Sequence, residues 1–264
     1  MKTVTSRDGA RIAFDQCGAG PAVILVDGAL QYRAFDQGMT ELAERLSEHY
    51  TVIHYDRRGR GDSTDTLPYA LEREIEDIEA LIDEAGGSAF LYGISSGAAL
   101  ALEAALALPD KVRKLAMYEV PYNDEEAARI AWREYGKQLR ELLAEDRKGD
   151  AVGLFMRLVG ASAQDVEGIQ QTPMWPMWES IGHTLAYDHI AALGEDASVP
   201  IERAARLSVS TLIMHGTESY PFMHTTALAL ARVIPSAHLH TLANQTHEVT
   251  AEALAPVLVE FFRA

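Results

Sequence analysis

The stretch Phe90-Leu91-Tyr92-Gly93-Ile94-Ser95-Ser96-Gly97-Ala98-Ala99 decides the fold of this chain. The apolar run 89–92 predicts a buried strand, and the Ala- and Leu-rich run 98–108 predicts a helix. The turn between them is so short that it forces a strained backbone on its apex, and it requires Gly93 and Gly97 as neighbours. Ser95 is that apex. GxSxG between a strand and a helix is typical of a nucleophile elbow, which exposes a serine hydroxyl beside a helix N-terminus.

Strand and helix patterns alternate on both sides of this stretch. Asp8-Gly9 predicts a hairpin between strands 2–6 and 11–16. Further strands are predicted at 22–26, 51–55, 114–118, 211–214 and 238–242, and further helices at 34–48, 70–85, 222–233 and near the C-terminus. Such alternation predicts an α/β fold with a mostly parallel central sheet and helices on both faces.

One segment interrupts the alternation. Residues 122–199 contain helical patterns at 125–145, 151–159 and 176–193 and no convincing strand. We therefore expect a core formed by residues 1–121 and 200–264, with residues 122–199 inserted as a helical lid.

Charge and composition narrow the function. The chain has 264 residues and a net charge of −16, so it is expected to repel the phosphates of nucleic acids and anionic membrane surfaces. Its single cysteine, Cys17, excludes an intrachain disulfide and a cysteine-based zinc site. The sequence has no signal-peptide pattern and no apolar run long enough to span a membrane. We expect a cytoplasmic monomer or homodimer whose partner is a small molecule.

Several further motifs stand just after predicted strands, where ligands bind in open α/β sheets. They are VDGA at 26–29, DRRGRGDS at 56–63, MHGTES at 214–219 and NQTHEV at 244–249. With GISSG at 93–97, they occur in the order found in the α/β-hydrolase fold superfamily, which the chain resembles along its whole length. The Asp-Gly pair at 27–28 and the Ser-Ser-Gly elbow also resemble the zearalenone-type lactone hydrolases.

The resemblance implies a catalytic triad. Ser95 is the expected nucleophile, and His247, in the loop after the last strand, is the expected base. Many relatives carry the acid where this chain has Ser219, and a neutral hydroxyl cannot stabilise an imidazolium. Glu119, at the end of the strand 114–118, is the expected acid, as in the zearalenone-type enzymes. Glu218, Asp188 and Glu248 are weaker alternatives.

The oxyanion hole needs two backbone N–H donors. Ser96 is expected to supply one, and Gly28 or Ala29 the other. Asp27 stands where most relatives carry a histidine. Because an unpaired carboxylate beside an oxyanion would oppose catalysis, we expect Asp27 to turn away or to pair with Arg57 or Arg58.

The inserted segment is rich in aromatic and methionine side chains, which suit a bulky apolar ligand. The residues expected to line the substrate pocket are Trp175, Trp178, Met156, Tyr187 and Phe222. The sequence thus predicts a serine hydrolase of esters or lactones that needs no cofactor and no metal. Thioester or carbon–carbon bond hydrolysis, cofactor-free oxygenation and non-catalytic ligand binding remain alternatives on the same scaffold.

Overall fold

A computed structural model describes residues 1–264, with the side chains of residues 190–192 outside the description. Eight strands form one sheet in the order β1-β2-β4-β3-β5-β6-β7-β8. They are β1 (Lys2–Thr5), β2 (Arg11–Cys17), β3 (Ala22–Val26), β4 (Thr51–Tyr55), β5 (Ala89–Ile94), β6 (Val112–Tyr118), β7 (Ser210–Gly216) and β8 (Ala237–Leu242). β2 pairs antiparallel with both β1 and β4, and all other pairings are parallel. The predicted α/β-hydrolase architecture is confirmed.

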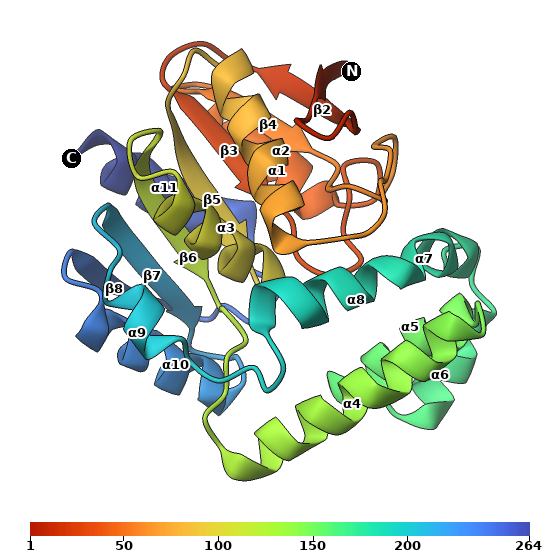
Figure 1. The fold of residues 1–264 in the computed structure, drawn as a ribbon. Coiled ribbons are helices and arrows are strands. Elements are labelled where there is room, and N and C mark those ends of the chain that lie inside the picture. The colour runs from red at the N-terminus through yellow and green to blue at the C-terminus, as the bar shows by residue number, and fades with distance from the viewer.

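Helices cover both faces of the sheet (Figure 1). The helices packed on the core strands are α1 (Gln37–Leu46), α2 (Leu71–Glu84), α3 (Ser96–Ala107), α10 (Pro221–Val233) and α11 (Ala251–Arg263), and a short α9 (Ile201–Ala204) precedes β7. α1 and α11 share one apolar core with the sheet, and α2, α3 and α10 share the other. Every residue of β3 and β5 is buried because both faces of these central strands are covered.

The segment between β6 and α9 contains helices and no strand in the described backbone. Its elements are α4 (Glu126–Ala144), α5 (Lys148–Leu158), α6 (Ala163–Gln170), α7 (Trp175–Ile181), η1 (Gly182–Thr184), α8 (Leu185–Tyr187) and η2 (Asp188–Leu193). Figure 1 shows these helices gathered on one side of the sheet, where they share an apolar core of their own. α6 was not predicted from the sequence, although a capping box between Ser162 and Asp165 marks its start.

Among the described residues, no helix combines the length and the apolar composition that crossing a membrane requires.

Candidate active site

Ser95 occupies the turn between β5 and α3. Its φ of 54° and ψ of −129° are strained for a residue with a side chain. The Ser95 N–H donates to Tyr118 O at 3.0 Å, so the β5–β6 hydrogen bonding continues up to the turn. A Cβ at Gly97 would lie 2.3 Å from Val26 O, so only glycine allows this close approach. The turn therefore has the geometry of a nucleophile elbow.

Glu119 directly follows β6, the strand that pairs with β5 beside the elbow. Its backbone N–H donates to Met214 O at 3.0 Å, which places it between β5 and β7. His247 lies in the loop between β8 and α11, and its Nδ1 is 2.7 Å from Glu119 Oε2. The Tyr118 hydroxyl donates to Thr246 O and so fixes the loop that carries His247. The predicted pairing of Glu119 with His247 is present.

Ser219 also contacts Glu119. Its hydroxyl donates to Glu119 Oε2 at 2.7 Å, and the Gly216 N–H donates to Glu119 Oε1 at 2.9 Å. Burial by itself would raise the pKa of Glu119, but the hydrogen bonds from His247, Gly216 and Ser219 lower it below its ordinary value. The Glu119 side chain is fully buried. It is therefore a buried, ionised carboxylate directed at one nitrogen of His247.

The alternative acids lie elsewhere. Asp188 forms ion pairs with Arg57 and Arg60, at 2.7 and 2.8 Å. Glu218 and Glu248 are exposed at the pocket rim. Of the four carboxylates considered from the sequence, only Glu119 has a hydrogen bond to His247 among the described residues.

Two backbone N–H groups near Ser95 are available as donors. Ser96 is the first residue of α3, so its N–H has no acceptor within the helix. The Gly28 N–H, in contrast, donates to Gln31 Oε1 at 2.7 Å. The Ala29 N–H makes no hydrogen bond to another described residue, and Ala29 lines the pocket. Of the two predicted positions in this loop, only Ala29 therefore has a backbone N–H that no other described residue engages.

Asp27 pairs with a residue that the sequence analysis did not consider. Both of its carboxylate oxygens lie within 3.1 Å of His54 Nε2, and Asp27 is completely buried. Burial opposes protonation of His54, but Asp27 outweighs it and raises the pKa of His54. Of the two alternatives expected for Asp27, the pairing with Arg57 or Arg58 is wrong: Arg57 reaches only the Asp27 carbonyl, at 3.3 Å, and Arg58 binds Asp77 and Asp8. The other alternative, that the carboxylate turns away, agrees with the absence of Asp27 from the pocket lining.

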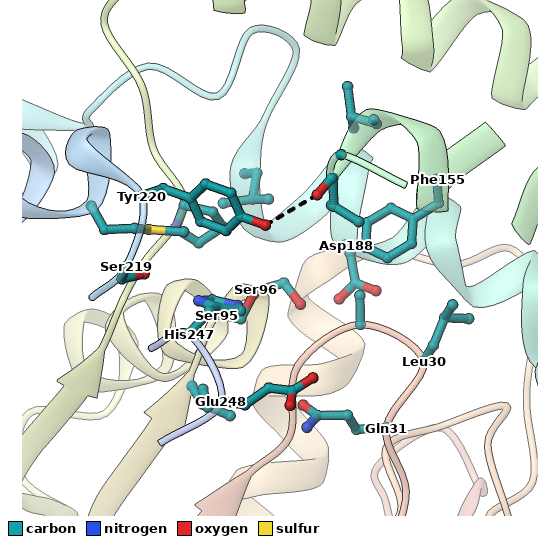
Figure 2. A pocket seen from close by; sticks show the side chains of 18 of the residues that line it. Leu30, Gln31, Ser95, Ser96, Phe155, Asp188, Ser219, Tyr220, His247 and Glu248 are labelled. Atoms are coloured by element: carbon teal, nitrogen blue, oxygen red, sulfur yellow. Dashed lines mark hydrogen bonds between the residues drawn. The ribbon is translucent and has the colours of Figure 1, made fainter. Parts of the chain in front are cut away.

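A pocket of about 1290 Å³ opens above Ser95. Figure 2 shows Ser95, Ser96 and His247 close together, with Phe155 and Leu30 on the opposite side of the pocket. The Tyr220 hydroxyl donates to Val159 O at 3.2 Å, which links the loop after β7 to the end of α5. Most of the lining is apolar. Its charged members are all carboxylates, namely Asp36, Asp188, Asp196, Glu218 and Glu248.

Three of the five residues predicted for the pocket line it, namely Met156, Trp178 and Phe222. Trp175 and Tyr187 do not. Trp175 is buried in the core of the helical segment, and Tyr187 stacks on Tyr69 with its hydroxyl on Asp65 at 2.5 Å. Helical spacing turned these two side chains away from the cavity, and the sequence could not distinguish the two sides of such short helices.

Buried charge beside the pocket also escaped the sequence analysis. Arg57, Arg58 and Arg60, in the loop after β4, are all at most 1% exposed. The sequence did contain a signal for these buried ion pairs, namely three arginines within four positions at the end of a buried strand. Buried guanidinium groups require carboxylate partners. Those partners are Glu74 and Asp77 of α2, Asp188 of η2, and Asp8 in the turn between β1 and β2. Among the described residues, no group of three or more His, Cys, Asp or Glu is arranged to hold a metal ion.

Comparisons with known proteins show what this chain is similar to. A family model described as "Alpha/beta hydrolase family" matches residues 19–258. The zearalenone hydrolase of Cladophialophora bantiana is 24% identical over 232 residues, which cover 76% of this chain and 86% of that protein.

Solved structures are similar over almost the entire chain. A crystal structure of an alpha/beta hydrolase from Sphaerobacter thermophilus is 51% identical, with a TM-score of 0.88, and the match covers 99% of this chain and all of that one. The enol-lactonase of Burkholderia xenovorans has a TM-score of 0.72 at 18% identity, with both chains fully covered. The similarity to the enol-lactonase, at this low identity, shows a shared fold alone.

Proposed function

Because the chain belongs to the alpha/beta hydrolase family, we propose that it is a serine hydrolase that cleaves an ester or lactone of a bulky, uncharged, apolar substrate. The observation that carries the proposal is the 2.7 Å hydrogen bond between His247 Nδ1 and the buried carboxylate of Glu119. An acceptor-only carboxylate requires a proton on Nδ1, which leaves Nε2 free to act as a base. Ser95 and His247 line the same pocket.

In the acylation step, Ser95 Oγ attacks the substrate carbonyl while His247 takes the hydroxyl proton. The carbonyl electrons move onto oxygen, and the N–H groups of Ser96 and Ala29 stabilise the resulting oxyanion. His247 then protonates the leaving alkoxide, and the C–O bond of the ester breaks. Water, activated by His247, releases the acid and restores Ser95. Glu119 stabilises the imidazolium in both halves of the reaction.

The lining of the pocket sets the substrate class. Large apolar surfaces such as those of Trp178, Phe155 and Met156 favour a bulky hydrophobic ligand. No Lys or Arg is present among the described lining residues, so an anionic substrate would meet carboxylates without a cationic partner. We propose that the helices of residues 122–199 act as a lid that shapes this pocket and excludes water from the acyl intermediate.

Hydrolysis of a panel of neutral aryl esters and macrolactones by the wild type and by Ser95→Ala tests the proposal. We expect turnover by the wild type and its loss in Ser95→Ala. Specific binding of an apolar ligand without turnover of any ester, thioester or lactone would favour a binding protein instead.

A further inference from the structure

Arg60 is a buried cation behind the loop that follows β3. It is 1% exposed, and its Nη1 donates to Gly28 O at 2.5 Å. Its Nη2 donates to Asp188 Oδ2 at 2.8 Å, and its Nε donates to Thr184 Oγ1 at 3.1 Å. Asp188 and Thr184 both belong to the helical segment between β6 and β7. One guanidinium thus joins the loop after β3 to that segment.

The contact with Gly28 O fixes the direction of a neighbouring donor. Gly28 O and the Ala29 N–H belong to one peptide unit, which is planar and trans. In such a unit, the C=O and the N–H point in opposite directions. Because Arg60 holds the carbonyl on one side, the Ala29 N–H must point away from Arg60. Arg60 is absent from the pocket lining, whereas Ala29 is part of it.

The preceding peptide unit is held in the same manner. Arg57 Nη1 lies 3.3 Å from Asp27 O, and the Gly28 N–H donates to Gln31 Oε1. The Gln31 amide is oriented by Asp36, whose Oδ2 accepts from Gln31 Nε2 at 2.6 Å. A carboxylate can only accept, so the amide oxygen must face the Gly28 N–H. Every polar group of the two peptide units is therefore engaged except the Ala29 N–H.

We propose that Arg60 is a positioning residue of the oxyanion hole, which turns the Ala29 N–H toward the reacting carbonyl by binding the far side of the same peptide unit. Asp188 holds Arg60 in place, so a residue of the helical segment supports the loop after β3. The positive charge also polarises the peptide unit and makes its N–H a stronger donor. This inference rests on the proposed hydrolase function, and Arg60 itself does not touch the substrate.

The test compares Arg60→Met with Arg58→Met. Arg58 is an equally buried arginine of the same loop, but its partners are Asp77, Asp8, Thr66 and Arg73 O rather than residues 27–31. Removing a direct oxyanion donor costs about 10² to 10³ in kcat, so loss of its positioning by Arg60→Met should lower kcat by about 10- to 100-fold. KM for a neutral aryl ester should stay within about twofold of the wild-type value, since the Arg60 contact matters mainly in the transition state. Arg58→Met should retain kcat within about threefold at a temperature where it is folded.

A pair of inhibitors separates positioning from general damage. An aryl trifluoromethyl ketone adds to Ser95 Oγ, the serine proton moves to His247, and the carbonyl oxygen becomes an oxyanion. The matching methyl ketone stays a neutral carbonyl. We expect Arg60→Met to lower the affinity for the trifluoromethyl ketone by the same factor as it lowers kcat/KM. The affinity for the methyl ketone should stay unchanged. An equal loss of affinity for both ketones, or an unchanged affinity for both, would overturn the proposal.

Arg60→Met leaves Asp188 with one cationic partner, so the single variant could fail to fold. The double variant Arg60→Met with Asp188→Asn removes one charge of each sign and leaves the Arg57–Glu74 pair intact. If Arg60 positions the peptide, kcat and the affinity for the trifluoromethyl ketone stay low in the folded double variant. Recovery of both to within threefold of wild type would show that Arg60 only balances Asp188. A wild type without turnover would instead refute the proposed hydrolase function.

Discussion

The Ser219 hydroxyl donates a 2.7 Å hydrogen bond to Glu119 Oε2, the same oxygen that contacts His247 Nδ1. Ser219 stands where many members of the fold family carry the acid, and here it donates to a carboxylate from the neighbouring strand that we propose as the acid. The two positions have separate roles: Glu119 provides the charge, and Ser219 helps to hold it.

Glu119→Gln is expected to lower kcat by about 10³- to 10⁴-fold, because a neutral amide cannot stabilise the imidazolium or enforce the correct tautomer. KM should change little. Steady-state kinetics on a neutral aryl ester measures both values.

Ser219→Ala is the matched control for that variant. It removes one hydrogen bond to Glu119, and an ordinary hydrogen bond is worth about 0.5 to 1.5 kcal/mol, so kcat should fall by about 2- to 10-fold. The opposite ranking, with Ser219→Ala the more damaging change, would show that Glu119 is not the acid.

The pair formed by Asp27 and His54 predicts a pH-dependent stability. The pKa of His54 is raised in the folded state, above its ordinary value of 6.5. Protonated His54 therefore stabilises the fold fully below pH 6.5, and this contribution is lost as the pH rises through the folded-state pKa. We expect the free energy of unfolding to decrease with pH above 6.5, and to decrease less steeply in His54→Gln.

Denaturant unfolding at a series of pH values from 6 to 9 measures this difference. His49→Gln is the control, because His49 is exposed. If wild type and His54→Gln lose stability in parallel, Asp27 is not stabilised by a protonated His54 and the assignment of this pair is wrong.

The acidic lining of the pocket predicts a preference for neutral substrates. 4-Nitrophenyl valerate and the mono-4-nitrophenyl ester of glutaric acid have acyl chains of the same length but differ by one carboxylate. We expect kcat/KM to be at least about tenfold higher for the valerate, with a smaller difference at high ionic strength. Equal or faster hydrolysis of the glutarate would show that an unidentified cationic group faces the substrate.

Trp178 and Trp175 offer a matched test of the apolar wall. Trp178 lines the pocket and makes an edge-to-face contact with Phe35, at 5.3 Å between ring centroids. Trp178→Ala should raise KM for a bulky aryl ester by about 5- to 30-fold, corresponding to about 1 to 2 kcal/mol of lost apolar contact. KM for a small acetate ester should change little.

Trp175→Phe should lower thermal stability and leave KM for the bulky ester unchanged, because Trp175 packs within the core of the helical segment. A rise of KM in Trp175→Phe alone would place the substrate on the other side of α7.

The sequence predicted those parts of the molecule that follow from short-range constraints. The elbow at Ser95 is confined to five residues, and the apolar strands on either side determine which end of the sheet carries Glu119. The partners of buried charges could not be predicted. His54 reaches Asp27 only because β3 and β4 are adjacent, and Asp188 reaches Arg60 through the packing of a distant helical segment. The orientation of Trp175 and Tyr187 likewise depends on how short helices pack.

The most direct test of the account is covalent labelling of Ser95 by an aryl or alkyl fluorophosphonate, followed by mass spectrometry of the intact protein and of its peptides. We predict one phosphonyl adduct per chain in the wild type, located on the peptide that contains Ser95, and no adduct in Ser95→Ala. A folded wild type that acquires no adduct, or an adduct that persists in Ser95→Ala, would contradict it.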